Sequence, residues 1–210
     1  MLKEIGQLSI CIDQESVDRK LNKFIASIVY FMLKSNYNYK LTTNVFKTPW
    51  FSIEEIPHVS GAEKPYYSIS CPDSVAVLAQ TVAGEFILVS QFRPPQGQVT
   101  LELPSGYFPR DEDPLLAAGR ELLEETGYSC EELVHLGFLK ICPSRITNVI
   151  HAYCGFNARF TGKKQEHGIE VVLLSASAFE KYILTGLYNE SVGIAMYFMS
   201  KEKKIFYEIP

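Results

Sequence analysis

Apolar and polar positions follow two different periods along this chain, and together they predict a mixture of strands and helices. Two apolar runs, 75–80 and 85–92, flank a short turn at 81–84, which is typical of a β-hairpin. Further strands are predicted at 98–103, 136–142, 148–160 and 169–175. Because the strands are interleaved with helices and partly joined by hairpins, the pattern indicates an α+β sandwich around a mixed β-sheet.

The first predicted helix covers residues 13–34, where apolar side chains recur at steps of three and four. Its most apolar part, 24–33, is too short for a bilayer, which needs about 20 apolar residues. The polar connector that follows separates an N-terminal helical extension, 1–44, from a main domain, 45–210. The apolar stripe of this helix either packs on the main domain or forms an interface with another subunit.

Three more helices have recognisable ends. Asp113 suits an N-cap, Pro114 suits the first helical position, and Gly127 suits the residue after the last turn. Two further helices are predicted at 177–185 and from a cap at Asn189 to about Lys203. The capping residues therefore predict helix bounds that the structure can test.

Composition and charge exclude several classes of function. The chain has 210 residues and a net charge of -4, and it shows no basic stripe of the kind that binds nucleic acid. Its five cysteines are scattered without a C-x-x-C pair, which argues against a disulfide scaffold or a zinc site. We therefore expect a soluble cytoplasmic protein whose partner is a small molecule, with no nucleic acid and no membrane.

The helix at 113–127 carries more negative charge than it can neutralise. Glu121 and Glu125 lie four residues apart, and Glu124 lies three from Glu121, so the three carboxylates share one face. Each like-charged pair at this spacing costs about 0.2–0.5 kcal/mol, and Arg120 alone cannot offset three acids. Such a face either is simply solvated or binds hard divalent cations, which prefer carboxylate oxygens.

These residues belong to a longer pattern that resembles the Nudix box, G-x5-E-x7-R-E-U-x-E-E-x-G-U, in which U is a bulky apolar residue. The matching positions are Gly106, Glu112, Arg120, Glu121, Leu122, Glu124, Glu125, Gly127 and Tyr128. Flanking segments at 89–106 and 142–153 are similar to those of ADP-ribose pyrophosphatases, and the likeness extends over about residues 48–200. The resemblance implies a Nudix-type α/β/α sandwich with a mixed sheet that hydrolyses a phosphoanhydride.

The resemblance also implies a metal site built from oxygen ligands. The expected ligands are the carboxylates of Glu121, Glu124 and Glu125 and the backbone carbonyl of Ser105. Mg²⁺ is the expected cation, with Mn²⁺ as a substitute. Arg120 and Glu112 would hold the ligand carboxylates in place, since side chains around a metal site orient its ligands.

Substrate contacts are expected from four side chains outside the box. Arg93 is a candidate diphosphate clamp, because its guanidinium fork matches phosphate geometry. Trp50 is placed where the family often supplies an aromatic ring to stack on adenine, with Tyr67 or Tyr66 as the second face. Arg145 either contacts a phosphate or ribose or faces solvent.

The residue that activates the attacking water is left open by the sequence. ADP-ribose pyrophosphatases often supply a glutamate from the loop before the strand at 169–175, and His167 stands at one such position with Glu166 beside it. The base is therefore Glu166, His167 or Glu124, and we favour Glu166. Histidine titrates near neutral pH, which keeps His167 in consideration.

The activity that this resemblance implies is metal-dependent hydrolysis of a nucleoside diphosphate sugar, with ADP-ribose as the leading substrate giving AMP and ribose 5-phosphate. GDP-mannose or another nucleotide sugar is the alternative substrate, since base recognition lies outside the box. A nucleotide-sugar sensor that binds without turnover is the alternative from another class. Such enzymes usually form homodimers, which is also expected here.

Overall fold

The structure is a computed structural model, and it describes residues 42–57, 64–163 and 165–206. The helix expected at 13–34 lies outside these residues, and the division of the chain at 44/45 stays a prediction. No helix in the described ranges has the length and apolar character needed to cross a membrane.

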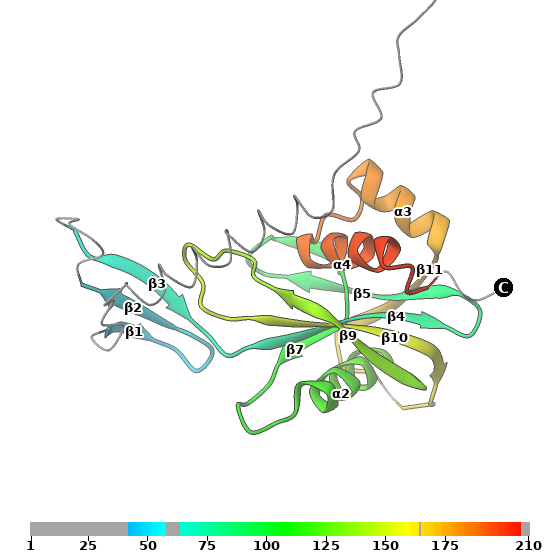
Figure 1. The fold of residues 1–210 in the computed structure, drawn as a ribbon, viewed down its shortest axis with the longest axis horizontal. Helices are drawn as coiled ribbons and strands as arrows, with labels where there is room; N and C mark the ends of the chain where they lie inside the picture. Colours follow the sequence, from blue (N-terminus) through cyan, green and yellow to red (C-terminus); the bar gives the residue numbers. More distant parts are fainter. Residues whose placement is uncertain (1–41, 58–63, 164, 207–210) are drawn as a thin grey trace, which may run out of the picture. The chain divides into compact units, whose positions relative to one another are not determined.

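An eight-stranded mixed sheet forms the centre of the domain (Figure 1). Its strands are β4 (Ser74–Thr81), β5 (Glu85–Arg93), β6 (Gln98–Glu102), β7 (Ser105–Tyr107), β8 (Tyr128–Ser129), β9 (Glu132–Leu139), β10 (Ile150–Phe160) and β11 (Ile169–Ser175). The order along the sheet is β11-β5-β4-β10-β8, with β6 beside β5, β7 beside β4 and β9 beside β10. Only β4 and β10 pair in parallel, so the predicted mixed sheet and its first hairpin are confirmed.

Helices cover both faces of this sheet, as Figure 1 shows, with α2 (Pro114–Thr126) on one side and α3 (Ala176–Thr185) and α4 (Ser191–Glu202) on the other. Alternate residues of β4 pack against the helices on the two faces of the sheet, because successive side chains of a strand point to opposite faces. Val75 and Val77 pack with Leu122 of α2, whereas Leu78 packs with Phe179 of α3. The expected α/β/α sandwich is confirmed.

The helix bounds agree closely with the capping residues, with one error. Asp113 caps α2 through its side chain, which accepts from the Leu115 amide at 2.7 Å, and Gly127 follows in the left-handed region. The last helix is capped by Glu190 rather than by the predicted Asn189, because the Glu190 carboxylate accepts from two amides of the first turn.

One predicted strand was misplaced, and another sheet was missed. The strand expected at 136–142 is β9, which begins earlier because Glu132 already pairs with Phe156 of β10, and it ends at Leu139. A separate antiparallel sheet contains β1 (Thr43–Lys47), β2 (Ser52–Ile56) and β3 (Tyr66–Ser70). The Ile69 amide at the end of β3 donates to the Arg145 carbonyl at 2.7 Å, which joins this sheet to the loop before β10.

Candidate active site

The carboxylates of the box lie on one face of helix α2, because the other face is buried in the core. Ala117, Ala118 and Leu122 are fully buried against the sheet. The C-terminal end is fixed by Gly127, whose amide donates to the Leu123 carbonyl at 2.9 Å. The helix therefore cannot rotate away from the strand β7, which lies beside its acidic face.

The carboxylate of Glu121 lies directly against the backbone of Gly106. A Cβ added at Gly106 would lie about 2.3–2.4 Å from the Glu121 carboxylate atoms, which is a severe overlap. The box glycine is thus needed for close approach of the two elements rather than for an unusual backbone angle. This contact brings Glu121 beside Ser105, the residue expected to supply a backbone ligand.

Glu125 reaches the same place from the next turn of α2. Its side chain is almost completely buried, at 6% exposure, and its Oε2 accepts from the Ser105 amide at 3.0 Å. Burial raises the pKa of Glu125 to about 7, and the negative charges of Glu121 and Glu166 add to this, while Arg93 acts in the opposite direction. A buried carboxylate with a raised pKa is a common mark of a functional site.

Arg120 supplies the positive charge of the helix and binds three acids at once. Its Nε and Nη2 donate to Glu112 at 2.9 and 3.0 Å, and its Nη1 donates to Glu121 at 2.7 Å and to Glu124 at 3.2 Å. Pairing with Arg120 lowers the pKa of Glu112, whereas burial raises that of Glu121 despite the same partner. Glu125 has no hydrogen bond to Arg120 among the described contacts. The positive charge of Arg120 therefore does not neutralise the whole acidic face.

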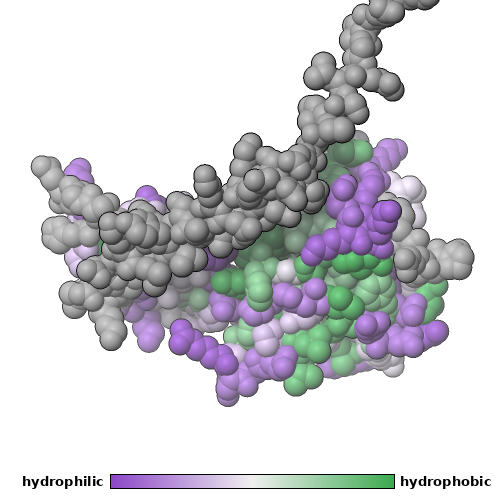
Figure 2. Space-filling model, in the orientation of Figure 1, coloured by the Kyte–Doolittle hydropathy of each residue, from purple (hydrophilic) through white to green (hydrophobic). Residues whose placement is uncertain are grey.

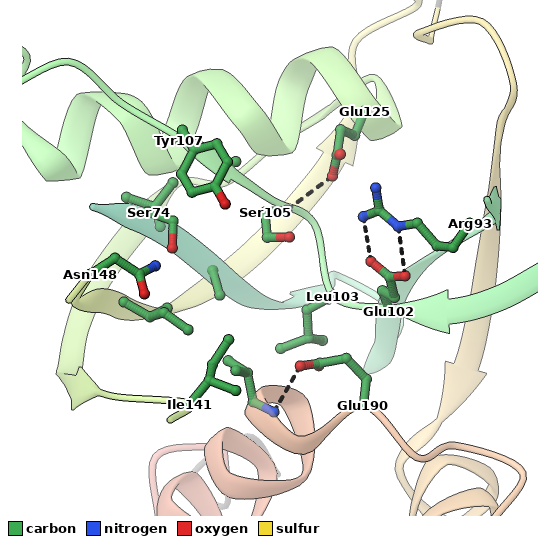
Figure 3. A pocket seen from close by; sticks show the side chains of 15 residues that line it. Ser74, Arg93, Glu102, Leu103, Ser105, Tyr107, Glu125, Ile141, Asn148 and Glu190 are labelled. Atoms are coloured by element: carbon green, nitrogen blue, oxygen red, sulfur yellow. Dashed lines mark hydrogen bonds and ion pairs between the residues drawn. The ribbon is translucent and has the colours of Figure 1, made fainter. Parts of the chain in front are cut away.

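A cavity of about 490 Å³ opens beside Ser105 and Glu125, between α2 and the start of α4 (Figure 3). Arg93 stands at its wall, and its Nε and Nη2 donate to Glu102 at 2.9 and 2.6 Å. This pairing raises the pKa of Arg93 and, although burial opposes it, lowers that of Glu102. The expected diphosphate clamp is thus at the cavity, with one guanidinium nitrogen outside this pairing.

Sequence reasoning missed Glu102 as the partner of Arg93. Both residues stand on the β5–β6 hairpin, but they are not opposite one another, since Arg93 pairs with Gln98 and Glu102 pairs with Val89. Attraction between directly opposite residues of a ladder therefore does not predict this pair. Thr100 adds a hydrogen bond of 2.6 Å to the same carboxylate, which fixes its orientation.

The other expected substrate contacts lie away from this cavity. Trp50 is 69% exposed and lines a second cavity of about 1040 Å³, together with Glu112. The Arg145 guanidinium lies over the Tyr66 ring, 4.2 Å from its centroid, and the Tyr66 hydroxyl donates to the Ser144 carbonyl. Tyr67 donates to Glu55 at 2.8 Å. The described chain brings none of these aromatic rings to the carboxylates of α2.

Glu166 lies at the acidic face, as the favoured assignment requires. Its amide donates to the Glu124 carbonyl at 3.0 Å, which anchors the loop to α2. The charge of Glu166 contributes to the raised pKa of both Glu121 and Glu125. His167 is exposed in the same loop. The loop is therefore attached to α2 at Glu124, and it brings the charge of Glu166 near Glu121 and Glu125.

The residues that converge here suit a hard cation. No three acidic, histidine or cysteine side chains of the described ranges form a ready-made metal cage, and Glu124 is paired with Arg120. Glu121 lies against Gly106 and Glu125 accepts from the Ser105 amide, so both carboxylates lie beside neighbouring residues of β7. Oxygen donors of this kind fit Mg²⁺ or Mn²⁺.

Comparison with known families decides what this arrangement is. Residues 72–183, more than half of the chain, match the NUDIX domain. This chain belongs to the Nudix family. Its box retains every charged position, and the chain is a Nudix pyrophosphohydrolase.

Individual relatives agree with this Nudix assignment. The chain is 26% identical over 158 residues to the methanol dehydrogenase activator of Bacillus methanolicus, covering 73% of this chain and 85% of that protein. It is 31% identical over 114 residues to the ADP-ribose pyrophosphatase of Bacillus subtilis, covering 54% of this chain and 62% of that protein. A solved structure described as an ADP compounds hydrolase has the same fold, with a TM-score of 0.66, 18% identity, and coverage of 77% of this chain and 90% of that one.

Proposed function

We propose that this Nudix hydrolase cleaves the diphosphate bond of a nucleoside diphosphate sugar in a reaction that depends on a divalent cation. ADP-ribose is the leading substrate, and its hydrolysis gives AMP and ribose 5-phosphate. The observation that carries the proposal is that Glu121 and Glu125 lie against Gly106 and Ser105 of β7, beside a cavity that Arg93 also lines. The similarity to an ADP-ribose pyrophosphatase supports the choice of substrate.

The metal ligands in this proposal are Glu121, Glu124, Glu125 and the carbonyl oxygen of Ser105, and the expected cation is Mg²⁺, with Mn²⁺ as a substitute. A bound divalent cation neutralises phosphate oxygens and lowers the pKa of coordinated water. Glu124 is now paired with Arg120 at 3.2 Å and must turn from it to act as a ligand. Glu112 holds two nitrogens of Arg120, so Arg120 remains anchored when Glu124 leaves.

Arg93 then binds the diphosphate at the cavity wall. Its Nη1 lies outside the pairing with Glu102, and it is the nitrogen we assign to a phosphate oxygen. Positioning and electrostatic stabilisation supply most of the catalysis in phosphoryl transfer, and an arginine held beside the ligands contributes to both. Glu102 keeps the guanidinium in one orientation.

The attacking water gives up its proton to a carboxylate at the edge of the site. We favour Glu166, because its negative charge raises the pKa of both Glu121 and Glu125. His167 and Glu124 are the alternatives. General bases of this kind contribute about 10²–10⁴-fold to the rate.

Binding of the nucleoside end is assigned to a second copy of the chain. Trp50, Tyr67 and Arg145 lie on or against the three-stranded sheet and away from the carboxylates of the same chain. In a homodimer this sheet would bring those side chains to the partner's cavity. Such an arrangement would explain why an exposed tryptophan and the acidic face are separate within one copy.

A substrate panel with fixed Mg²⁺ tests the proposal. We expect release of AMP from ADP-ribose, and we expect Glu125→Gln to lose nearly all turnover while its circular dichroism spectrum stays that of the wild type. If the enzyme prefers GDP-mannose, the proposed reaction stands but the proposed substrate is wrong. Tight binding of ADP-ribose without AMP release would instead indicate a nucleotide-sugar sensor, and wild-type turnover by Glu125→Gln would reject the metal assignment.

A further inference from the structure

The segment that leads from β6 into the box is held at each of its residues. The Pro104 carbonyl accepts from the Val77 amide of β4 at 3.0 Å. The Ser105 amide donates to Glu125 at 3.0 Å. Glu102 is held by Arg93, as described above. Only Leu103 is fixed from the opposite side of the sheet, by a residue that lies outside the box.

That residue is Tyr188, which lies in the turn between α3 and α4. Its side chain is fully buried in the apolar cluster that also contains Leu103, and its hydroxyl lies near the Leu103 backbone. The same hydroxyl donates to Glu190 Oε2 at 2.9 Å. A fixed chain of contacts thus runs from Glu190 through Tyr188 to the residue two positions before Ser105.

Glu190 connects this chain to helix α4. Its Oε1 accepts from the Val192 amide at 2.7 Å, and its Oε2 accepts from the Gly193 amide at 2.6 Å. A Cβ at Gly193 would overlap the Tyr188 hydroxyl, so the phenol packs directly on the helix backbone. The start of α4 therefore acts as a rigid support for Tyr188.

The choice of glutamate at this position is informative. Helix N-caps favour Ser, Thr, Asp and Asn, whose short side chains bond the first-turn amides. Glutamate has one more methylene, and here that length lets the cap also reach the Tyr188 hydroxyl. The residue thus serves two purposes, and capping alone does not require it.

We propose that Tyr188 and Glu190 are positioning residues for the cation site: through Leu103 they hold the Ser105 backbone at the distance from Glu125 that cation binding needs. This inference rests on the proposed metal-dependent function. It assigns a role to two side chains on the opposite side of the sheet from α2. Their removal changes the affinity of the site for the cation, and not only the stability of the fold.

The test is Tyr188→Phe, which keeps the ring and removes the hydroxyl. Its matched control is Tyr197→Phe, because Tyr197 packs on the same Phe179 ring and its hydroxyl donates to Glu180 at 3.0 Å, remote from Ser105. Mn²⁺ affinity, measured by electron paramagnetic resonance without substrate, is expected to fall about tenfold in Tyr188→Phe, the lower end of the loss caused by removing direct partners of metal ligands. Tyr197→Phe is expected to bind Mn²⁺ like the wild type.

A second variant keeps the inference testable if Tyr188→Phe does not fold. Glu190→Asp keeps a good cap and its charge but shortens the reach to Tyr188, so its Mn²⁺ affinity should also fall. Wild-type affinity in both Tyr188→Phe and Glu190→Asp overturns the inference, as does an equal loss in Tyr197→Phe. Failure of the wild type itself to bind Mn²⁺ would reject the proposed function, which is a distinguishable result.

Discussion

At the scale of single residues, the site is dominated by a conflict at Glu125. This carboxylate is buried, and its neighbours Glu121 and Glu166 carry the same charge. The position is unfavourable for the fold, and the Ser105 amide offsets only part of the cost. A residue kept in such surroundings is better explained by function than by stability.

This conflict predicts that, without a cation, Glu125→Gln becomes more stable than the wild type as the pH rises. The pKa of Glu125 is raised from 4.5 to about 7, so the folded state holds a proton that the unfolded state loses in this range. The free energy of unfolding of the wild type, relative to that of Glu125→Gln, is therefore highest below pH 4.5. It falls by up to about 3 kcal/mol as the pH rises through 7. Denaturant unfolding in a chelator at pH 5 and pH 8 measures the difference.

The control for this prediction is Glu124→Gln, because Glu124 is far more exposed than Glu125. Its effect on the free energy of unfolding should change less between the two pH values. An unfolding free energy for Glu125→Gln that equals the wild type at both pH values would contradict the interpretation of Glu125 as a strained carboxylate.

The loop at 165–168 carries a second prediction at this scale. Glu166→Gln should lower kcat by about 10²–10⁴-fold if its carboxylate accepts the proton of the attacking water. His167→Asn should lower kcat less, because this histidine is exposed beside it. Steady-state kinetics at saturating Mg²⁺ decide between them, and the reverse order of effects would assign the base to His167.

At the scale of elements, the sequence predicted the parts of the fold that have strong local signals. The bounds of α2 followed from Asp113, Pro114 and Gly127, whose preferences are set by helix geometry alone. The strands β1 to β3 were missed because most of their residues are polar or exposed, and their pairing depends on distant partners. The cap at Glu190 was missed because it serves a tertiary contact as well as its helix.

The end of α2 gives a prediction that separates backbone strain from crowding. Gly127 has φ of +74°, and an added Cβ would lie 2.7 Å from the Lys163 carbonyl oxygen. Gly97 has φ of +63°, and nothing lies within 4 Å of the same position. Gly97→Ala should cost about 1–2 kcal/mol through the left-handed backbone alone, and Gly127→Ala should cost more. Equal losses of unfolding free energy would contradict the close packing of the β10 end on this helix.

At the scale of the whole molecule, the site is assembled from segments that the sequence could not place. The box predicted which acids gather on α2, but not that Glu102, Tyr188 and Glu190 surround the backbone of the adjoining strand. Such contacts depend on the packing of helices on opposite faces of the sheet. Figure 2 shows polar and apolar side chains interspersed on the described part of the visible face.

Assembly into a homodimer is a prediction at this largest scale. Phe46 on β1 is 54% exposed and lies 6.5 Å from the Phe51 ring, so the three-stranded sheet carries apolar surface that a second copy can cover. Phe46→Glu should shift a dimer toward monomer in analytical ultracentrifugation. Val82→Glu is the control, since Val82 is equally exposed, at 53%, in the β4–β5 turn. A monomeric wild type would contradict the prediction.

The most direct test is anomalous diffraction at the manganese edge from a crystal soaked with Mn²⁺ and a non-hydrolysable ADP-ribose analogue. The account predicts an anomalous peak at about 2.0–2.3 Å from oxygens of Glu121 and Glu125 and from the Ser105 carbonyl, with the diphosphate of the analogue against it. A bound analogue with no peak at these carboxylates, or with the metal held elsewhere, would contradict it.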